Sequence, residues 1–158
     1  MAHAILFEDI FDIKQLNADG KKFERVNRLH CKGTTYDVDL VVDVNAELFA
    51  VRAGERVTVA VASTLAMDGT PDDGQYNPYP GPSLLDSYDY AMHGRVFNIK
   101  HSGQQHQNVE VSASFGGLLF KLDGEQAQLS AIEADMRVFL LMRRGGLDSF
   151  SGGSAMEM

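Results

Sequence analysis

The stretch that most constrains the fold runs from residue 109 to 123, where two alternating apolar runs flank Gly116-Gly117. A glycine pair supplies the positive φ angles that a two-residue β-hairpin turn requires, so the sequence predicts a tight hairpin here. One register makes a whole face of this ribbon apolar, pairing Phe115 with Leu118, Ala113 with Phe120 and Val111 with Leu122. Such a face must be covered by a second sheet or by the far wall of a barrel.

Further segments also alternate with the period of two that is typical of half-buried strands. These predicted strands are Ile5–Leu16, Phe23–Cys31, Tyr36–Val44, Arg56–Leu65, Tyr88–Ile99 and Met136–Met142. Seven or eight strands joined by short polar turns, with no convincing long helix, predict a closed or nearly closed antiparallel β-barrel.

Several details of these strands can be checked. Tyr36, Leu65 and Tyr88 are expected on core-facing sides, and a β-bulge is expected near Gly94. Residues 124–135 fit a helical turn or a short edge strand equally well. The run Val138-Phe-Leu-Leu-Met142 has no polar face, so this last strand is either central or has its outer face against a partner.

The chain has 158 residues, which is economical for one domain with a single core. We expect this barrel domain to span residues 1–144. Residues 66–87 form a long acidic loop, because their glycines and prolines break both helix and strand. Residues 145–158 are rich in glycine and serine and are predicted to be a flexible C-terminal tail.

The net charge is −8, and the acidic loop carries much of the excess. Binding to nucleic acid draws on basic groups, so this composition argues against an autonomous DNA- or RNA-binding protein. We expect an intracellular protein, since there is no basic leader and no long apolar run, and since a lone Cys31 cannot form an internal disulfide. Cys31 is interpreted as a small buried hydrophobe.

No pattern of catalytic or metal-binding residues is present. The nucleophile motif G-x-S-x-G and the glycine-rich phosphate loops are missing, and the histidines do not form H-x-x-x-H. The acidic loop imitates a calcium loop only superficially, because Asp73 stands where that loop needs glycine and Tyr79 where it needs an acid. We therefore expect no catalytic residue, no metal and no cofactor.

A small barrel can also be an oligonucleotide-binding fold, in which aromatic rings stack on bases and basic groups follow the phosphates. The candidates for such a surface are Lys21, Lys22, Phe23, Arg25 and Arg28. The alternative is a solvated strand face of mixed charge, which the presence of Glu24 among these residues favours.

Seven blocks, in order, carry a resemblance to a known family: Ala4–Lys14, Gly20–Val26, Asp39–Asn45, Ala62–Leu65, Asp72–Tyr76, Ser114–Leu119 and Asp135–Leu141. Across residues 1–144 the chain resembles the eighth-numbered small subunit shared by the eukaryotic nuclear RNA polymerases I, II and III. The segment between Tyr76 and Tyr88 departs from that pattern, and residues 145–158 extend beyond it.

The resemblance implies a Greek-key barrel of the oligonucleotide-binding type that has no enzymatic activity of its own. It also implies a nuclear location and docking on the largest polymerase subunit. Glycines that fix the path of the acidic loop, and aspartates able to pair with basic groups, place the expected partner-facing surface at Asp68, Gly69, Asp73, Gly74 and Tyr76. The alternative function is a free-standing protein that binds single-stranded nucleic acid.

Overall fold

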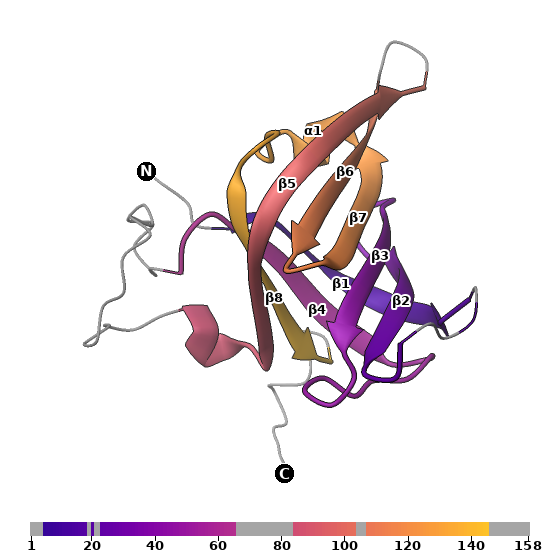
Figure 1. Ribbon diagram of the computed structural model, residues 1–158. Helices are drawn as coiled ribbons and strands as arrows, with labels where there is room; N and C mark the ends of the chain where they lie inside the picture. Colours follow the sequence, from indigo (N-terminus) through magenta and orange to yellow (C-terminus); the bar gives the residue numbers. More distant parts are fainter. Residues whose placement is uncertain (1–4, 19, 21–22, 66–83, 104–106, 146–158) are drawn as a thin grey trace, which may run out of the picture.

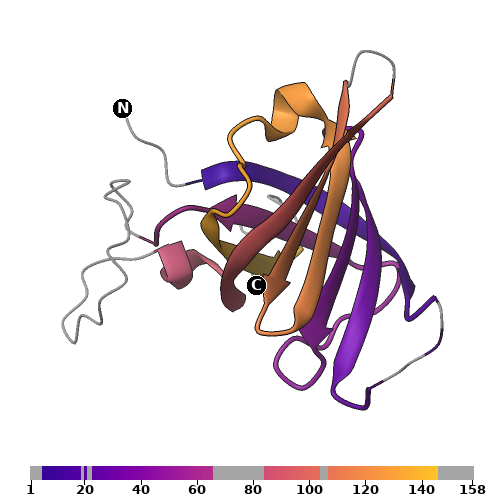
Figure 2. The ribbon, with the colours of Figure 1, turned by 45° about the horizontal axis from the view of Figure 1, so that its top comes forward.

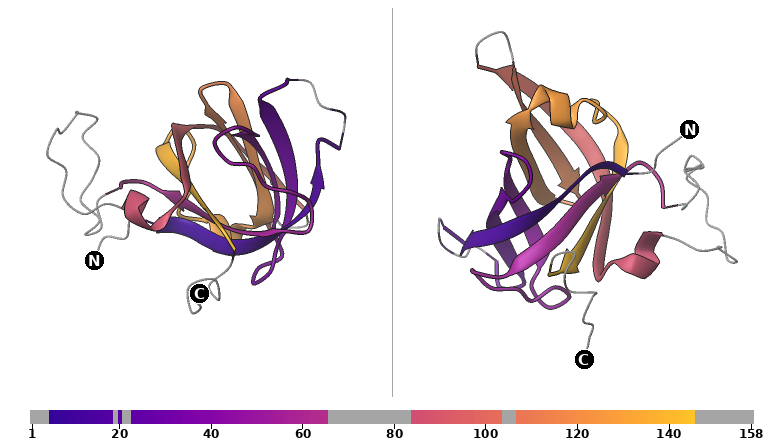
Figure 3. Two further views of the ribbon diagram at one scale, coloured as in Figure 1. Left: turned by 90° about the horizontal axis from the view of Figure 1, so that it is seen from below. Right: turned by 180° about the vertical axis from the view of Figure 1, so that it is seen from behind.

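The protein is a closed barrel of eight antiparallel strands (Figures 1 and 3). The computed structural model describes residues 5–18, 20, 23–65, 84–103 and 107–145. The strands are β1 (Ile5–Leu16), β2 (Val26–Gly33), β3 (Asp39–Asn45), β4 (Arg56–Ala62), β5 (Tyr90–Ser102), β6 (Asn108–Phe115), β7 (Leu118–Glu125) and β8 (Arg137–Arg144). Two short helical elements accompany them, the 3-10 turn η1 (Leu84–Ser87) and the helix α1 (Gln126–Leu129).

Around the barrel the strands follow the order β1-β2-β3-β7-β6-β5-β8-β4. β1, β2 and β3 are consecutive neighbours, and β4 returns to lie beside β1, which is the Greek-key arrangement. The predicted fold class is therefore confirmed, and the barrel is consistent with the oligonucleotide-binding type. No helix in the described part of the chain is long and apolar enough to span a membrane.

The β6–β7 hairpin has the predicted register. Phe115 pairs with Leu118, Ala113 with Phe120 and Val111 with Leu122. Gly116 and Gly117 both have positive φ, at 64° and 93°, as a two-residue turn of this kind requires. The inward faces of the strands fill the barrel, and Phe11, Leu29, Val42, Phe120 and Leu140 are at most 2% exposed.

The ambiguous segment after β7 closes one end of the barrel (Figure 2). β7 continues to Glu125, and α1 follows as a single turn. Leu129 and Ile132 are buried in the main core, where they cover the apolar end of the barrel. The helical alternative for this segment is the one that the structure adopts.

Three strand details were wrong. Tyr36 precedes β3 and is 39% exposed, because it lies in a bend at residues 34–37. Its ring contacts the ring of Phe7. Leu65 and Tyr88 do not face the barrel interior. They pack on its outer wall, in a second apolar cluster with Ala60, Ala62, Leu141 and the partly buried Ile5, Leu84 and Phe139.

The bulge in β5 lies at Phe97 instead of Gly94, since the register shifts between Val96 and Asn98. Gly94 has a different role. A Cβ at this position would lie 2.1 Å from the backbone oxygen of Ser114, so only glycine allows β5 and β6 to approach so closely.

The last strand, β8, is central, which is one of the two arrangements that its lack of a polar face predicted. β8 lies between β5 and β4. On its outer face Leu141 is fully buried by the second cluster, so part of this face is covered by the chain itself.

Candidate interaction surface

No metal-binding cluster is present among the residues that the structure describes, where no group of three or more His, Cys, Asp or Glu side chains could hold an ion. Cys31 is buried in the core, as interpreted from the sequence. Burial, with a smaller effect of Asp12, raises the pKa of the Cys31 thiol to about 12. The thiol is therefore protonated at neutral pH and is a poor nucleophile.

The predicted partner-facing residues Asp68, Gly69, Asp73, Gly74 and Tyr76 lie outside the described residues, so their role stays a prediction. The two ends of the loop that carries them are nevertheless defined. The backbone N–H of Leu84 donates to the carbonyl oxygen of Leu65 at 2.8 Å, so the loop leaves and re-enters the fold at one place.

Side chains hold the returning end of this loop against the outer wall of the barrel. The hydroxyl of Tyr88 donates to a carboxylate oxygen of Glu8 at 2.7 Å, and the guanidinium of Arg143 lies 5.3 Å from the centre of the Tyr88 ring. Arg143 also donates to the carbonyl oxygen of Ser87 at 3.1 Å. Burial, and then the contact with Glu8, raise the pKa of Tyr88. The tyrosine stays neutral and works as a hydrogen-bond donor.

Of the residues proposed to contact nucleic acid, Lys21 and Lys22 also lie outside the described residues. Phe23 is 67% exposed. Arg25 pairs with Glu47 at 3.6 Å, whereas Arg28 is held by Asp43. The two arginines therefore do not converge on a common site in the structure.

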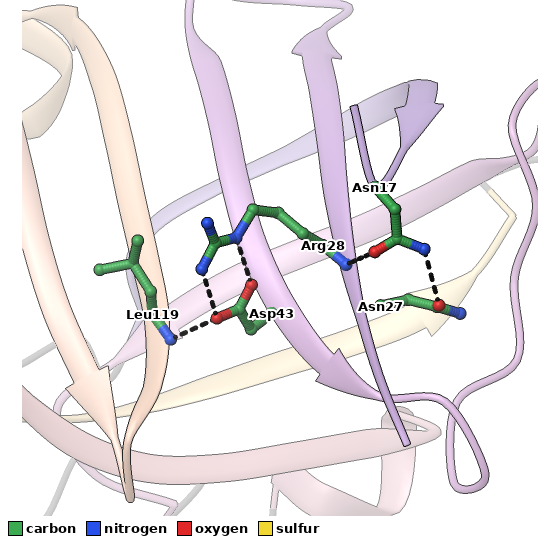
Figure 4. A network of polar contacts seen from close by, with 5 residues as sticks. All are labelled: Asn17, Asn27, Arg28, Asp43 and Leu119. Carbon is green, nitrogen blue, oxygen red and sulfur yellow. Dashed lines mark hydrogen bonds and ion pairs between the residues drawn. The ribbon is translucent and has the colours of Figure 1, made fainter. Parts of the chain in front are cut away.

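Arg28 belongs to a polar network that joins three strands (Figure 4). Its Nε and one terminal nitrogen donate to the two carboxylate oxygens of Asp43, at 2.7 and 3.0 Å. Asp43 is buried and also accepts the backbone N–H of Leu119 at 3.0 Å. On the other side, Asn17 accepts the backbone N–H of Arg28 and donates to Asn27.

This network continues the hydrogen bonding between β3 and β7 beyond the point where their backbone ladder ends. The last residue pair of that ladder is Val42 with Phe120, so the next N–H, that of Leu119, is bonded by the Asp43 side chain instead. A buried N–H without a partner would cost free energy. Arg28 therefore has a structural task that its basic character in the sequence did not reveal.

An open acidic cleft of about 390 Å³ lies elsewhere on the barrel. It is lined by Asp37, Asp39, Gln107, Asn108, Asp123, Gly124 and Glu125. Lys32 partly neutralises this cleft by pairing with Asp37 and, at 3.4 Å, with Asp39. Burial, together with the charges of Glu110 and Asp39, raises the pKa of Asp123.

Sequence reasoning missed this cleft because its side chains come from segments far apart in the chain. The strand alternation placed single carboxylates on outer faces, but only the pairing of Asp39 with Asp123 across β3 and β7 brings them together. Periodicity within one strand carries no information about which strand lies beside it.

A model of the family described as RNA polymerase Rpb8 matches residues 8–144, which include nearly the whole barrel. The chain belongs to the RNA polymerase Rpb8 family. The resemblance found in the sequence is thereby confirmed.

Curated members of the Rpb8 family align with this chain over almost their full length. Subunit 8B of DNA-directed RNA polymerases II, IV and V from Arabidopsis thaliana is 41% identical, over 90% of this chain and 98% of the relative. Subunit rpabc3 of polymerases I, II and III from Dictyostelium discoideum is 40% identical, over 89% and 98%. Subunit RPABC3 of polymerases I, II and III from Saccharomyces cerevisiae is 34% identical, over 88% and 97%.

Proposed function

We propose that this chain is a non-catalytic structural and assembly subunit shared by the nuclear DNA-directed RNA polymerases I, II and III. The observation that carries the proposal is the family match over residues 8–144, together with relatives that bear such names and align almost end to end. The described part of the barrel offers no metal cluster, and its one cysteine is buried with a raised pKa. The polymerase chemistry then belongs to other subunits.

The subunit docks on the largest polymerase subunit in the nucleus, and the acidic loop contributes Asp68, Gly69, Asp73, Gly74 and Tyr76 to the contact. The fold supports this assignment indirectly. The hydrogen bond between Leu84 and Leu65 and the contacts of Tyr88 hold the two ends of the loop on the barrel.

Affinity purification of the tagged full-length chain from nuclear extract tests the proposal. We expect the largest subunits of polymerases I, II and III to co-elute in amounts similar to the bait, as measured by quantitative mass spectrometry. Repeated purification of the folded chain without any of these subunits would refute the proposed function.

A matched pair of variants tests the loop residues. Replacing Asp68 and Asp73 with asparagine should lower recovery of the largest subunit without changing the melting temperature, because the eight strands of the described barrel contain neither residue. Glu133→Gln, an exposed acid in the turn before β8, is the control and should leave recovery unchanged. Equal recovery of the loop variant and the control would remove these residues from the interface.

Binding of single-stranded nucleic acid by the isolated chain is the alternative function, and the exposed ring of Phe23 is the feature that favours it. Two other candidates, Arg25 and Arg28, are paired with carboxylates, and the chain has a net charge of −8. A gel-shift assay over a range of salt decides between the two. Tight binding that weakens steeply with salt would favour the alternative.

A further inference from the structure

One part of the barrel surface combines unpaired basic groups with exposed aromatic rings. We name it the basic wall and define it as His93, Arg95, Phe97, Arg137 and Phe139 on the outer face of β5 and β8, two strands that pair side by side (Figure 1). Arg95 lies directly opposite Arg137 in the ladder, and both are exposed. His93 lies opposite Phe139, with 4.6 Å between the ring centres.

Like charges directly opposite each other on neighbouring strands destabilise a sheet. Neither Arg95 nor Arg137 forms an ion pair with any residue that the structure describes, including Glu133 and Asp135 in the adjacent turn. Other arginines of the barrel are paired with carboxylates, namely Arg25, Arg28, Arg56 and Arg144. The chain has a net charge of −8, yet no carboxylate among the residues that the structure describes pairs with either arginine.

The aromatic part of the basic wall is exposed for an identifiable reason. Phe97 continues the outward-facing alternation of His93 and Arg95 and is 56% exposed, and the register shift between Val96 and Asn98 begins only there. Next along β8 from Phe139, Leu141 is covered by η1 and Tyr88 of the same chain. Among the described residues, one half of this strand face is therefore covered, and the half beside Arg95 and Arg137 is exposed.

We propose that the basic wall docks an acidic segment of another protein subunit of the polymerase, which brings two carboxylates to Arg95 and Arg137 and an apolar side chain to Phe97. This inference deepens the proposed function and rests on it. Paired guanidinium groups bind carboxylates through charge-assisted hydrogen bonds, and a neighbouring aromatic ring adds apolar contact. The unfavourable arginine pair and its positive charge both favour an anionic occupant.

A protein segment fits better than a nucleic acid strand. The chain has a net charge of −8, and two arginines alone release few counterions from a polyanion, so they contribute little affinity for nucleic acid. Phe139 is partly buried and already contacts His93, which leaves Phe97 as the exposed phenylalanine of the basic wall.

Photo-crosslinking identifies the occupant. The photoreactive amino acid p-benzoylphenylalanine replaces Phe97 in the full chain, and the same substitution at Lys14, an exposed position on β1, is the control. After irradiation in nuclear extract, we expect a cross-link from position 97 to a segment of another polymerase subunit that contains at least two acidic residues. The control position should not give this product.

Charge variants then test the chemistry of the contact. Arg95→Glu with Arg137→Glu should lower the cross-link yield and the recovery of polymerase subunits by about tenfold. The matched control, Lys14→Glu with Arg52→Glu, makes the same change of charge at two exposed residues that form no ion pair within the described part of the chain, and it should leave both unchanged.

A single substitution separates lost docking from lost folding. Arg137→Glu creates an opposite-charge pair with Arg95, so the isolated chain should melt at the same temperature as the wild type or higher, while polymerase recovery falls. A variant that melts lower, or that docks as well as the wild type, would overturn the inference.

The outcomes distinguish this inference from the proposed function. A wild-type chain that recovers the polymerase while Arg95 and Arg137 can be reversed without effect refutes the inference alone. A charge-dependent cross-link only to a protein that is not a polymerase subunit would overturn the inference, and the proposed function would still stand if the wild-type chain recovers the polymerase. Three other results would overturn the inference. They are a cross-link to the chain's own residues 66–83, a product that nuclease removes, and the absence of any product at position 97.

Discussion

Replacing Asp43 with alanine removes the carboxylate that connects β2, β3 and β7, and the cost can be estimated from its contacts. Asp43 accepts two hydrogen bonds from Arg28, at 2.7 and 3.0 Å, and one from the backbone of Leu119 at 3.0 Å. The side chain of Asp43 is only 8% exposed, whereas that of Arg28 is 34% exposed. The variant therefore removes the acceptor of the part-buried Leu119 N–H and the carboxylate partner of a guanidinium that can still reach water.

The two losses differ in size. A hydrogen bond between the Leu119 N–H and a charged group contributes about 2 kcal/mol. Exposed ion pairs contribute about 0 to 1 kcal/mol to stability, and breaking a buried pair costs about 3 to 5 kcal/mol. The partly exposed pair of Arg28 and Asp43 lies between these cases, so we assign it a contribution of about 1.5 kcal/mol. Asp43→Ala should then lower the free energy of unfolding by about 3.5 kcal/mol, and the melting temperature by roughly 7 to 14 °C for a domain of this size.

Urea denaturation of the full chain measures the loss, and a double-mutant cycle with Arg28→Ala isolates the pair. We expect a coupling energy of about 1.5 kcal/mol between Arg28 and Asp43, with the remaining loss specific to the aspartate. Arg25→Ala is the control, since its pair with Glu47 is 76% and 64% exposed and should contribute less than about 0.5 kcal/mol. If the two single losses simply add in the double variant, the ion pair has no role in stability and our reasoning is wrong.

Three other predictions concern the barrel. Gly94→Ala places a Cβ 2.1 Å from the backbone oxygen of Ser114, so it should lower the free energy of unfolding in urea by about 3 kcal/mol. Gly116→Ala, where only the positive φ opposes the change, should lower it by roughly 1 to 2 kcal/mol. Equal losses in the two variants would contradict this role of Gly94. Burial and neighbouring carboxylates raise the pKa of Asp123 above its ordinary value, so its ionisation destabilises the native state as pH rises through the native pKa. Asp123→Asn should therefore raise the melting temperature near neutral pH and have no such effect well below the unfolded pKa; a gain that persists in acid would refute the electrostatic cause. Cys31, with a pKa of about 12, should react slowly with a thiol reagent at mildly alkaline pH in the native chain and rapidly in urea, and fast native labelling would show that the thiol is accessible.

The elements predicted correctly are those whose signal is local. The glycine pair at 116–117 determines the hairpin register because positive φ is needed within two residues of the turn. β1 begins and ends where its pattern predicted, and the buried Asp9, which interrupts that pattern, accepts the backbone N–H groups of Thr35 and Tyr36. Asp9, a polar residue on an apolar strand face, therefore holds the bend at residues 34–37 through its side chain.

The errors occurred where a second segment decides the answer. Tyr88 and Leu65 are apolar enough for a core, but η1 brings them to the outer wall, where Ala60 and Leu141 leave room. The bulge at Phe97 arises where β5 pairs with β6 on one edge and β8 on the other. The residue pattern of β5 alone does not show that β5 must pair with β6 and with β8 at this point.

The amino-acid sequence by itself determined an all-β chain, the hairpin and its register, the buried cysteine and the family, because alternation, turn glycines and motif blocks are properties of neighbouring residues. Only the tertiary structure decided which charges are satisfied. Barrel closure set Arg28 against Asp43 and Asp39 against Asp123, and left Arg95 facing Arg137. The physical reason is that an electrostatic energy depends on distance in space, and strand order, which fixes those distances, is the result of the whole barrel closing at once.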